Sequence, residues 1–116
     1  MAIAVPNVPG DDLSAMRHFY VDLLGFNVLF EATEDGARGL MGLELVGMRL
    51  HIDCPMEGHG RQICVSLEVE DVDAWYQRWS PAIPNLPAPI NQDWGSRTFG
   101  FQDPADNTIY VLGPIS

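Results

Sequence analysis

Residues 62–80 read QICVSLEVEDVDAWYQRWS, and the spacing of their apolar side chains changes once along this stretch. Every second residue from position 63 to position 69 is apolar, which is typical of a strand with one buried face. From position 71 to position 80 the apolar residues recur every three or four positions, which is typical of a helix with one buried face. Asp71 is the expected helix cap and Pro81 the expected stop. This stretch therefore predicts a strand that runs directly into a helix.

The first half of the chain repeats this order. A helix is predicted over residues 11–24, with Asp11 or Asp12 as its cap and Gly25 at its end. Its apolar stripe consists of Met16, Phe19, Tyr20, Leu23 and Leu24. Further strands are predicted at residues 26–31, 40–46, 48–53, 97–102 and 107–112. Four prolines between positions 81 and 89 predict a loop there, with room for no more than a short edge strand.

The chain is therefore organised as two copies of one βαβββ module. We predict an α+β fold in which the helix of each module covers one face of a curved mixed sheet. A single domain is expected over residues 1–116. Within it, module one spans residues 1–54, a turn-rich linker spans residues 55–61, and module two spans residues 62–116.

The charge balance excludes several kinds of partner. The 116 residues carry a formal net charge of −10, from 16 acidic residues against 6 basic ones, all of them Arg. So acidic a chain repels nucleic acid and anionic membranes and would attract a cationic ligand. The alternative explanation is that the acidity only keeps the protein soluble. The absence of lysine excludes Schiff-base catalysis. With 47% hydrophobic residues, a chain of this length forms a core without a metal or a disulfide.

The sequence also predicts a cellular location. No apolar run approaches the roughly 18 residues that a membrane span requires, and the first residues lack the basic start of a signal peptide. We therefore expect a cytoplasmic protein that has no membrane partner. Cys54 and Cys64 form no metal-binding pair motif and are expected as reduced thiols.

The strand alternation predicts a polar face on each sheet. If Val65 and Leu67 pack under the helices, the intervening residues of their strand point to the opposite face. The same reasoning places on that face His51, Asp53, Cys64, Ser66, Glu68, Glu70 and Tyr110. A sheet face of this composition is either open to water or curved around a ligand.

Three kinds of chemistry can be compared for this polar face. A metal site requires three or four converging side chains, for which His51, Asp53 and Glu68 are the candidates on these strands. A nucleophilic site requires Cys64 or a serine beside a base such as His51, but no nucleophile motif surrounds either residue. A binding pocket requires only shape, a few polar groups and aromatic surface, all of which the sequence supplies.

Four motifs in a fixed order connect these predictions to a known family. VPGDD at residues 8–12, followed by HFYVDLLGF at 18–26, forms the first motif, and EVEDVD at residues 68–73 forms the second. WGSRTF follows at residues 94–99 and DPADN at 103–107. Together they resemble the vicinal oxygen chelate superfamily, which includes glyoxalase I, extradiol dioxygenases, fosfomycin resistance enzymes and bleomycin resistance proteins. The resemblance spans nearly the whole chain and implies the fold of two βαβββ modules.

Within the superfamily, the chain most resembles the bleomycin resistance proteins. It shares with them its short length, its acidity, a proline-containing first strand at residues 5–8 and the WG-x-R segment that begins at Trp94. The resemblance implies a metal-free homodimer that sequesters a cationic antibiotic in grooves between its subunits without transforming it. Pro6 and Pro9 suit a first strand that leaves its own sheet and pairs with the other subunit.

The resemblance also allows the enzymes of the superfamily to be compared position by position. Their metal ligands correspond here to Ala4 or Val5, His51 or Asp53, Cys64, and Tyr110. Only one of these four places offers an ordinary ligand for a hard divalent ion, which argues for a binding protein with no metal, no cofactor and no catalytic residue. The alternative is a divergent metal-dependent enzyme, either a lyase or a dioxygenase, that uses His51, Glu68 and a ligand from a second subunit.

The predicted ligand cavity follows from the polar face and the motifs together. We expect it to be lined by His51, Asp53, Cys64, Ser66, Glu68, Trp94, Arg97 and Tyr110. Asp53, Glu68 and Glu70 would attract a small cationic or aromatic molecule, and Trp94 would stack on it. The positions from which drug-binding members stack their ligands hold no aromatic residue here: they are residues 36–38, Ser66 and Glu68. A third alternative is a cavity filled by side chains in a subunit of a larger assembly. Asp106 replaces the usual glycine of the DP-x-G-N motif, so a positive φ is expected there.

Overall fold

The computed structural model describes residues 2–55 and 62–116, so most of the predicted linker at 55–61 lies outside the described residues. The first half of the chain contains β1 (Asn7–Pro9), α1 (Leu13–Arg17), the π-helix η1 (His18–Leu23), β2 (Asn27–Thr33), β3 (Gly39–Leu45) and β4 (Met48–Cys54). The second half contains β5 (Cys64–Glu68), α2 (Val72–Trp79), β6 (Ile90–Asn91), β7 (Ser96–Gln102) and β8 (Thr108–Pro114).

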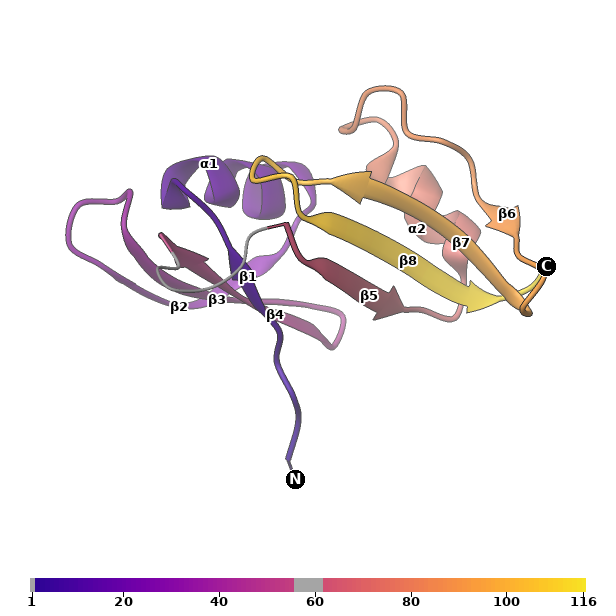
Figure 1. Cartoon of the computed structure of the whole chain (residues 1–116), viewed down its shortest axis with the longest axis horizontal. Helices are drawn as coiled ribbons and strands as arrows, with labels where there is room; N and C mark the ends of the chain where they lie inside the picture. The colour runs from indigo at the N-terminus through magenta and orange to yellow at the C-terminus, as the bar shows by residue number, and fades with distance from the viewer. Residues whose placement is uncertain (1, 56–61) are drawn as a thin grey trace.

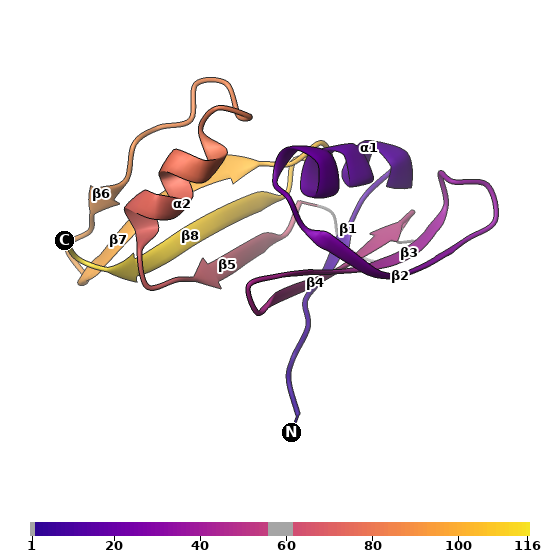
Figure 2. The ribbon, with the colours of Figure 1, turned by 180° about the vertical axis from the view of Figure 1, so that it is seen from behind.

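The strands form two sheets of the same topology, which confirms the predicted α+β fold of two βαβββ modules. The strand order is β1-β4-β3-β2 in the first sheet and β5-β8-β7-β6 in the second. In each sheet one parallel pair, β1 with β4 or β5 with β8, adjoins antiparallel strands. The sheets lie side by side, with α1 on one face of the first and α2 on one face of the second (Figures 1 and 2). The opposite face of each sheet is not covered by a helix of its own module.

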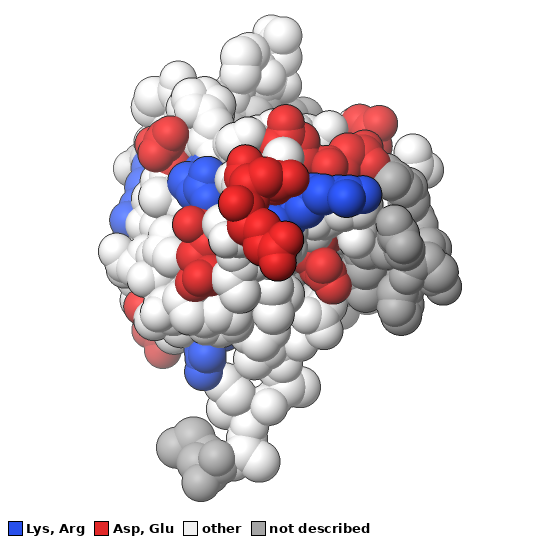
Figure 3. Space-filling view, turned by 90° about the vertical axis from the view of Figure 1, so that its left-hand side faces the viewer, with Lys and Arg blue, Asp and Glu red and all other residues white. Residues whose placement is uncertain are grey.

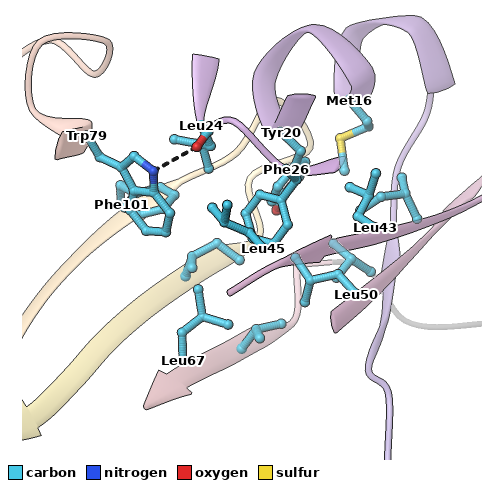
Figure 4. Packing of buried hydrophobic residues seen from close by; sticks show 14 of the residues in the cluster. Met16, Tyr20, Leu24, Phe26, Leu43, Leu45, Leu50, Leu67, Trp79 and Phe101 are labelled. Atoms are coloured by element: carbon cyan, nitrogen blue, oxygen red, sulfur yellow. Dashed lines mark hydrogen bonds between the residues drawn. The ribbon is translucent and has the colours of Figure 1, made fainter. Parts of the chain in front are cut away.

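A single hydrophobic core connects the two modules on the helix side of the sheets. Trp79 of α2 lies at the junction, where its indole Nε1 donates to the Leu24 carbonyl at 2.9 Å. Its ring stacks on Phe26 and contacts Phe101 edge-on. Figure 4 shows this junction, with Leu45 and Leu50 of the first sheet near Leu67 of the second. The apolar area buried there holds the two sheets in one relative position.

The first helix differs from the prediction in its second half. Residues 18–23 form a π-helix, in which the Leu24 N–H donates to the Phe19 carbonyl, five residues back. This wider turn leaves the buried residues at intervals of four, at Met16, Tyr20 and Leu24. The assignment of Leu23 to the apolar stripe is therefore wrong, because its side chain turns outward and is 37% exposed.

The predicted helix boundaries agree with the structure. Of the two candidate caps of the first helix, Asp12 is the one that accepts a hydrogen bond from the Ser14 N–H. Gly25 ends the helix with a φ of 88°, which glycine adopts without strain. Asp71 caps α2 through the Ala74 N–H, as predicted. The proline-rich stretch before β6 is a loop, and β6 is an edge strand of two residues.

The DPADN motif forms a turn whose two buried ends, Asp103 and Asn107, join the two modules. Asp103 accepts hydrogen bonds from the Tyr20 hydroxyl at 2.6 Å and from the Asn107 side chain at 2.9 Å. The Asn107 amide also donates to the Pro9 carbonyl at the end of β1, and its oxygen accepts from the Ile63 N–H just before β5. The expected positive φ at Asp106 is confirmed, at 63°.

The N-terminal segment differs in part from the expectation. Residues 7–9 pair in parallel with β4 of the same chain, so this part of the first strand stays on its own sheet. The residues before it extend away from the body of the molecule (Figure 1). Within the described residues, no helix has the length and apolar character that a membrane crossing requires.

Candidate functional site

The strand alternation predicted from the sequence is present in the structure. Val65 and Leu67 are buried on the helix side of β5, whereas Ser66 is exposed on the other side. β8 follows the same rule, because Ile109 and Val111 are buried and Tyr110 between them is 44% exposed. The face of the second sheet that lies away from α2 therefore carries polar and aromatic side chains.

A hollow of about 310 Å³ lies on this face. Its walls are Ser66, Gln92, Trp94, Thr98, Tyr110 and Leu112. Three of the predicted site residues, Ser66, Trp94 and Tyr110, thus line the same hollow. Trp94 is 66% exposed and Tyr110 is 44% exposed, so both rings have free surface at the hollow. Trp94 is therefore not packed in the hydrophobic core.

The aromatic wall of the hollow depends on a neighbouring glycine. Gly100 of β7 lies opposite Tyr110 in the register, and a Cβ atom at Gly100 would lie 3.0 Å from Tyr110 Cδ1. The missing side chain lets the phenol ring lie close over the neighbouring strand. On the other wall, the Gln92 side-chain amide donates to the Thr98 hydroxyl at 2.8 Å. This bond holds two hydrogen-bonding side chains at the rim.

The lining of this hollow is uncharged, and the acidic residues predicted for it lie beside it or elsewhere. Glu68 is opposite Leu112 in the register, next to the hollow. Glu68 and Glu70 also line a separate hollow of about 460 Å³ together with Val46, Met48, Val69, Asp71 and Trp75. The hollow with Trp94 and Tyr110 is therefore suited to hydrogen bonding and stacking more than to ion pairing.

Arg97 lies on the other face of the second sheet, away from the hollow. Its guanidinium holds Asp73 of α2 in a fork, with Nε and Nη2 donating to the two carboxylate oxygens at 2.8 and 2.9 Å. Arg97 lowers the pKa of Asp73, mainly through this hydrogen bonding, and Asp73 raises the pKa of Arg97 in return. The sequence already indicated this face of the sheet. Arg97 is two and four residues before the buried Phe99 and Phe101, so its side chain lies on the same side of β7 as theirs.

His51 and Asp53 lie on the corresponding face of the first sheet, on β4. His51 meets the ring of Phe30 edge-on, with centroids 5.3 Å apart. Phe30 lies directly over Gly42 of β3, where a Cβ atom would come within 2.1 Å of its ring, and it is 39% exposed. Each module thus presents one exposed ring above a glycine of the neighbouring strand.

Sequence reasoning missed Phe30 as a site residue. A register irregularity between Val28 and Phe30 interrupts the alternation of side chains along β2. The alternation alone therefore could not show on which face of the sheet Phe30 lies. The signal that could have found it is Gly42, since a glycine inside a strand often marks a close approach of another group.

Comparison with known proteins places this geometry in a family. A model of the Glyoxalase/Bleomycin resistance protein/Dioxygenase superfamily matches residues 2–111. The chain belongs to this superfamily. No curated protein matches the sequence closely enough to add a more specific name.

Solved structures of this superfamily have the same fold at low sequence identity. A bleomycin-binding protein from bleomycin-producing Streptomyces verticillus, complexed with copper(II)-bleomycin, is 26% identical, with a TM-score of 0.77 over 99% of this chain and 98% of that chain. A second bleomycin-binding protein, complexed with bleomycin, is 21% identical, with a TM-score of 0.80 over 99% and 100%. A lactoylglutathione lyase from Agrobacterium tumefaciens is 20% identical, with a TM-score of 0.75 over 97% and 94%. Binding proteins and an enzyme thus share this fold, and function has to be argued from the site.

This member of the superfamily does not gather a set of metal ligands within the described residues. No three His, Cys, Asp or Glu side chains among residues 2–55 and 62–116 come together in a way that could hold a metal ion. His51 and Asp53 lie on β4 of the first sheet, whereas Cys64, Glu68 and Tyr110 lie on the second. The donor set in one chain therefore does not fit the metal centre of the superfamily's enzymes.

The two thiols of this superfamily member differ in accessibility. Cys64 is exposed at the start of β5, on the same face as Ser66. Cys54 is buried, and burial, assisted by the negative charge of Asp53, raises its pKa from 9.0 to about 12. Cys54 is therefore a protonated core residue at neutral pH and has no nucleophilic role.

Proposed function

We propose that this protein binds a small aromatic molecule in the hollow between Trp94 and Tyr110 and does not transform it. The observation that carries the proposal is the exposure of both rings at one hollow, on a sheet face that no helix of its module covers. Exposed aromatic surface next to a concave region is the usual mark of a ligand site. The volume of about 310 Å³ is large enough for a ring system with two or three fused or linked rings.

The polar groups around the hollow would orient the ligand. The hydroxyls of Ser66, Thr98 and Tyr110 and the amide of Gln92 donate and accept hydrogen bonds. Glu68 adds one negative charge beside the hollow, which would favour a ligand with a cationic group at one end. The ligand class that fits is therefore a planar, hydrogen-bonding molecule with at most a peripheral positive charge.

The similar structures support binding without catalysis. The Streptomyces verticillus protein with 26% identity is a bleomycin-binding protein and matches nearly the whole of this chain. We propose the same class of function here, sequestration of an antibiotic or similar compound, because no three His, Cys, Asp or Glu side chains among the described residues come together in a way that could hold a metal ion.

We further propose that the binding unit is a homodimer. Phe30 and His51 on the first sheet offer an aromatic surface, and the segment before β1 extends from the body. A second copy that set its second sheet against this first sheet would enclose a ligand between Phe30 of one copy and Tyr110 of the other. The cytoplasmic location remains a prediction from the sequence.

The proposed function is tested by titration of the purified chain with metal-free bleomycin in low salt, measured by isothermal calorimetry. We expect a Kd below about 100 μM, because sequestration requires binding of at least this strength. Trp94→Ala should weaken binding at least tenfold, which corresponds to the loss of one stacked ring. Leu29→Ala, which removes another exposed apolar side chain, from edge strand β2, is the control and should bind normally.

Two results would overturn this proposal. The first is a wild-type protein that shows no heat of binding with bleomycin or with a planar fluorescent dye at concentrations up to 1 mM, taken as roughly the weakest useful affinity. The second is one equivalent of a transition metal per chain in protein purified without chelators, lost on His51→Ala. That result would favour the metal-dependent enzyme.

A further inference from the structure

Arg97 connects three parts of module two through one side chain. Two of its nitrogens form the fork with Asp73 of α2, and the third, Nη1, donates to the Asn91 side-chain oxygen of β6 at 3.3 Å. The side chain is only 19% exposed, so these contacts are partly shielded from water. Arginine can bridge two partners in this way because its donors form a rigid planar fork.

Asn91 is the last residue of β6 and precedes the turn that carries Trp94. β6 pairs with β7 through only two register positions, Ile90 with Thr98 and Asn91 with Arg97. Beyond them, the Gln92 N–H donates to the Ser96 carbonyl and the Gly95 N–H donates to the Gln92 carbonyl. The first of these bonds joins the turn to β7, as does the bond from the Gln92 side chain to the Thr98 hydroxyl.

On its other side the turn continues from β6, which is a very short edge strand. A two-residue pairing at a sheet edge is readily opened by thermal motion. The Arg97 guanidinium adds a contact from the base of the turn to α2, which is itself anchored in the core by Trp79. If that contact were lost, the turn would keep its bonds to β7 but lose its connection to α2, and we expect the Trp94 ring to become more mobile beside Tyr110.

We propose that Arg97 is a positioning residue, which fixes the Trp94 turn over the ligand hollow by holding Asn91 and Asp73 with one guanidinium. This inference rests on the proposed function, in which Trp94 stacks on the ligand. It changes the role that the sequence suggested for Arg97, from a residue that lines the cavity to one that acts from the opposite face of the sheet.

The first test observes Trp94 directly and needs no ligand. The chain contains three tryptophans, so protein labelled with 5-fluorotryptophan should give three fluorine NMR signals, and Trp94→Phe assigns one of them. In Arg97→Met we expect the Trp94 signal to shift and narrow toward that of a freely mobile side chain, while the Trp75 and Trp79 signals stay in place. Asn91→Ala, which leaves the pair of Arg97 with Asp73 intact, should move the same signal in the same direction.

A matched control is available in module one. Arg17 of α1 pairs with Glu31 of β2, so it also joins a helix to a strand with a partly exposed ion pair. Arg17→Met should leave the Trp94 signal unchanged. Arg97→Lys should give an intermediate shift, because an ammonium group can hold Asp73 but cannot reach Asn91 with the same geometry.

The second test measures coupling between the two residues with bleomycin as the probe. Arg97→Met should weaken binding about threefold to tenfold, which is the usual cost of ordering one large side chain on binding. In a Trp94→Ala background the same substitution should have no further effect, because Arg97 acts through Trp94. An additive loss in the double variant, or an unchanged Trp94 signal in Arg97→Met and Asn91→Ala, would overturn the inference.

The failure of the proposed function can be distinguished from the failure of this inference. A wild-type protein that does not bind bleomycin contradicts the function, but the fluorine signals still decide whether Arg97 positions Trp94. If circular dichroism shows that Arg97→Met does not fold, the Trp94 signal of Arg97→Lys and Asn91→Ala decides the question. The inference is contradicted if that signal is unshifted in both variants.

Discussion

The buried hydrogen bond between Tyr20 and Asp103 offers a quantitative test of how the two modules are held together. The Tyr20 hydroxyl comes from the helical segment of module one and the Asp103 carboxylate from the turn of module two, with 2.6 Å between the oxygens. Both residues are almost fully buried. Burial is the main cause that raises the pKa of Tyr20 far above its ordinary value, and the nearby Asp103 carboxylate adds to the effect. The phenol therefore remains a proton donor throughout the accessible pH range.

Tyr20→Phe removes only the hydroxyl and leaves the ring in its place. The Asp103 carboxylate keeps three other donors, the N–H groups of Ala105 and Asn107 and the side-chain amide of Asn107, at 2.9 to 3.0 Å. The charge is therefore not left unpaired, and the expected loss is that of one hydrogen bond to a charged group. We predict that the free energy of unfolding falls by about 1.5–3 kcal/mol.

The assay is equilibrium unfolding in urea, followed by tryptophan fluorescence and circular dichroism. With a slope of about 1–3 kcal/mol per molar urea, the transition midpoint should fall by about 1 M while the slope stays the same. Tyr76→Phe is the control, because the Tyr76 hydroxyl makes a long, partly buried hydrogen bond of 3.4 Å to the Leu86 carbonyl. That variant should lose less than about 0.5 kcal/mol.

A loss of under about 0.5 kcal/mol in Tyr20→Phe, or a loss no larger than that of Tyr76→Phe, would refute this reasoning. It would mean that the carboxylate is satisfied by the turn alone and that apolar packing between the modules, at Trp79 and Phe101, holds them together without help from the buried polar contact. A changed slope would point instead to partial separation of the modules before global unfolding.

Three further predictions concern the glycine on the first sheet and the two thiols. Gly42→Ala should cost about 1–3 kcal/mol of stability, because the new Cβ atom would lie 2.1 Å from the Phe30 ring. The loss is measured as a lower melting temperature, and a variant as stable as wild type would contradict this packing of Phe30 on Gly42. The pKa of Cys54, raised from 9.0 to about 12, means that the folded state binds a proton that the unfolded state releases above pH 9. The free energy of unfolding should therefore fall between about pH 9 and 12, measured by urea unfolding at each pH. Cys54→Ala should make this decline shallower, and an equally steep decline in the variant would contradict the raised pKa. Native protein at pH 8 should react with a thiol reagent at the exposed Cys64 only, and modification of both cysteines at equal rates would contradict the burial of Cys54.

The faces of the second sheet could be predicted from the sequence because its central strands alternate without interruption. In β5 and β8 the apolar positions have a strict period of two, so the sequence pattern alone assigns Ser66 and Tyr110 to the outer face. The helix caps at Asp12 and Asp71 were predictable for a similar reason, since they depend on interactions within one turn of the chain.

The features that could not be predicted arise where the backbone departs from a regular period. The bulge in β2 moves Phe30 onto the open face, and the π-helix η1 turns Leu23 outward. Both departures depend on packing between distant segments, which the local pattern does not contain. Arg97 is a different case, because two features of the sequence disagree about it. Its position in the alternation of β7 indicates the helix side of the sheet, whereas the WG-x-R motif suggested the cavity. The structure places Arg97 on the helix side, as the alternation indicates.

The distribution of the acidic residues limits what the net charge of −10 says about the ligand. Figure 3 shows Asp and Glu gathered, with Arg between them, over the end of the molecule that carries the β2–β3 connection. Glu34, Asp35 and Arg38 there line a hollow of about 790 Å³, which is broad, polar and remote in the fold from Trp94. Asp12, Asp71 and Asp103 make hydrogen bonds within the chain, and Asp73 pairs with Arg97. The charge near the hollow with Trp94 is therefore limited to Glu68 and to Asp93, which lies between the lining residues Gln92 and Trp94. We expect stacking and neutral hydrogen bonds to supply most of the binding energy. A ligand held in this way should bind almost equally well at low and high salt, whereas one drawn in by the acidic surface should not.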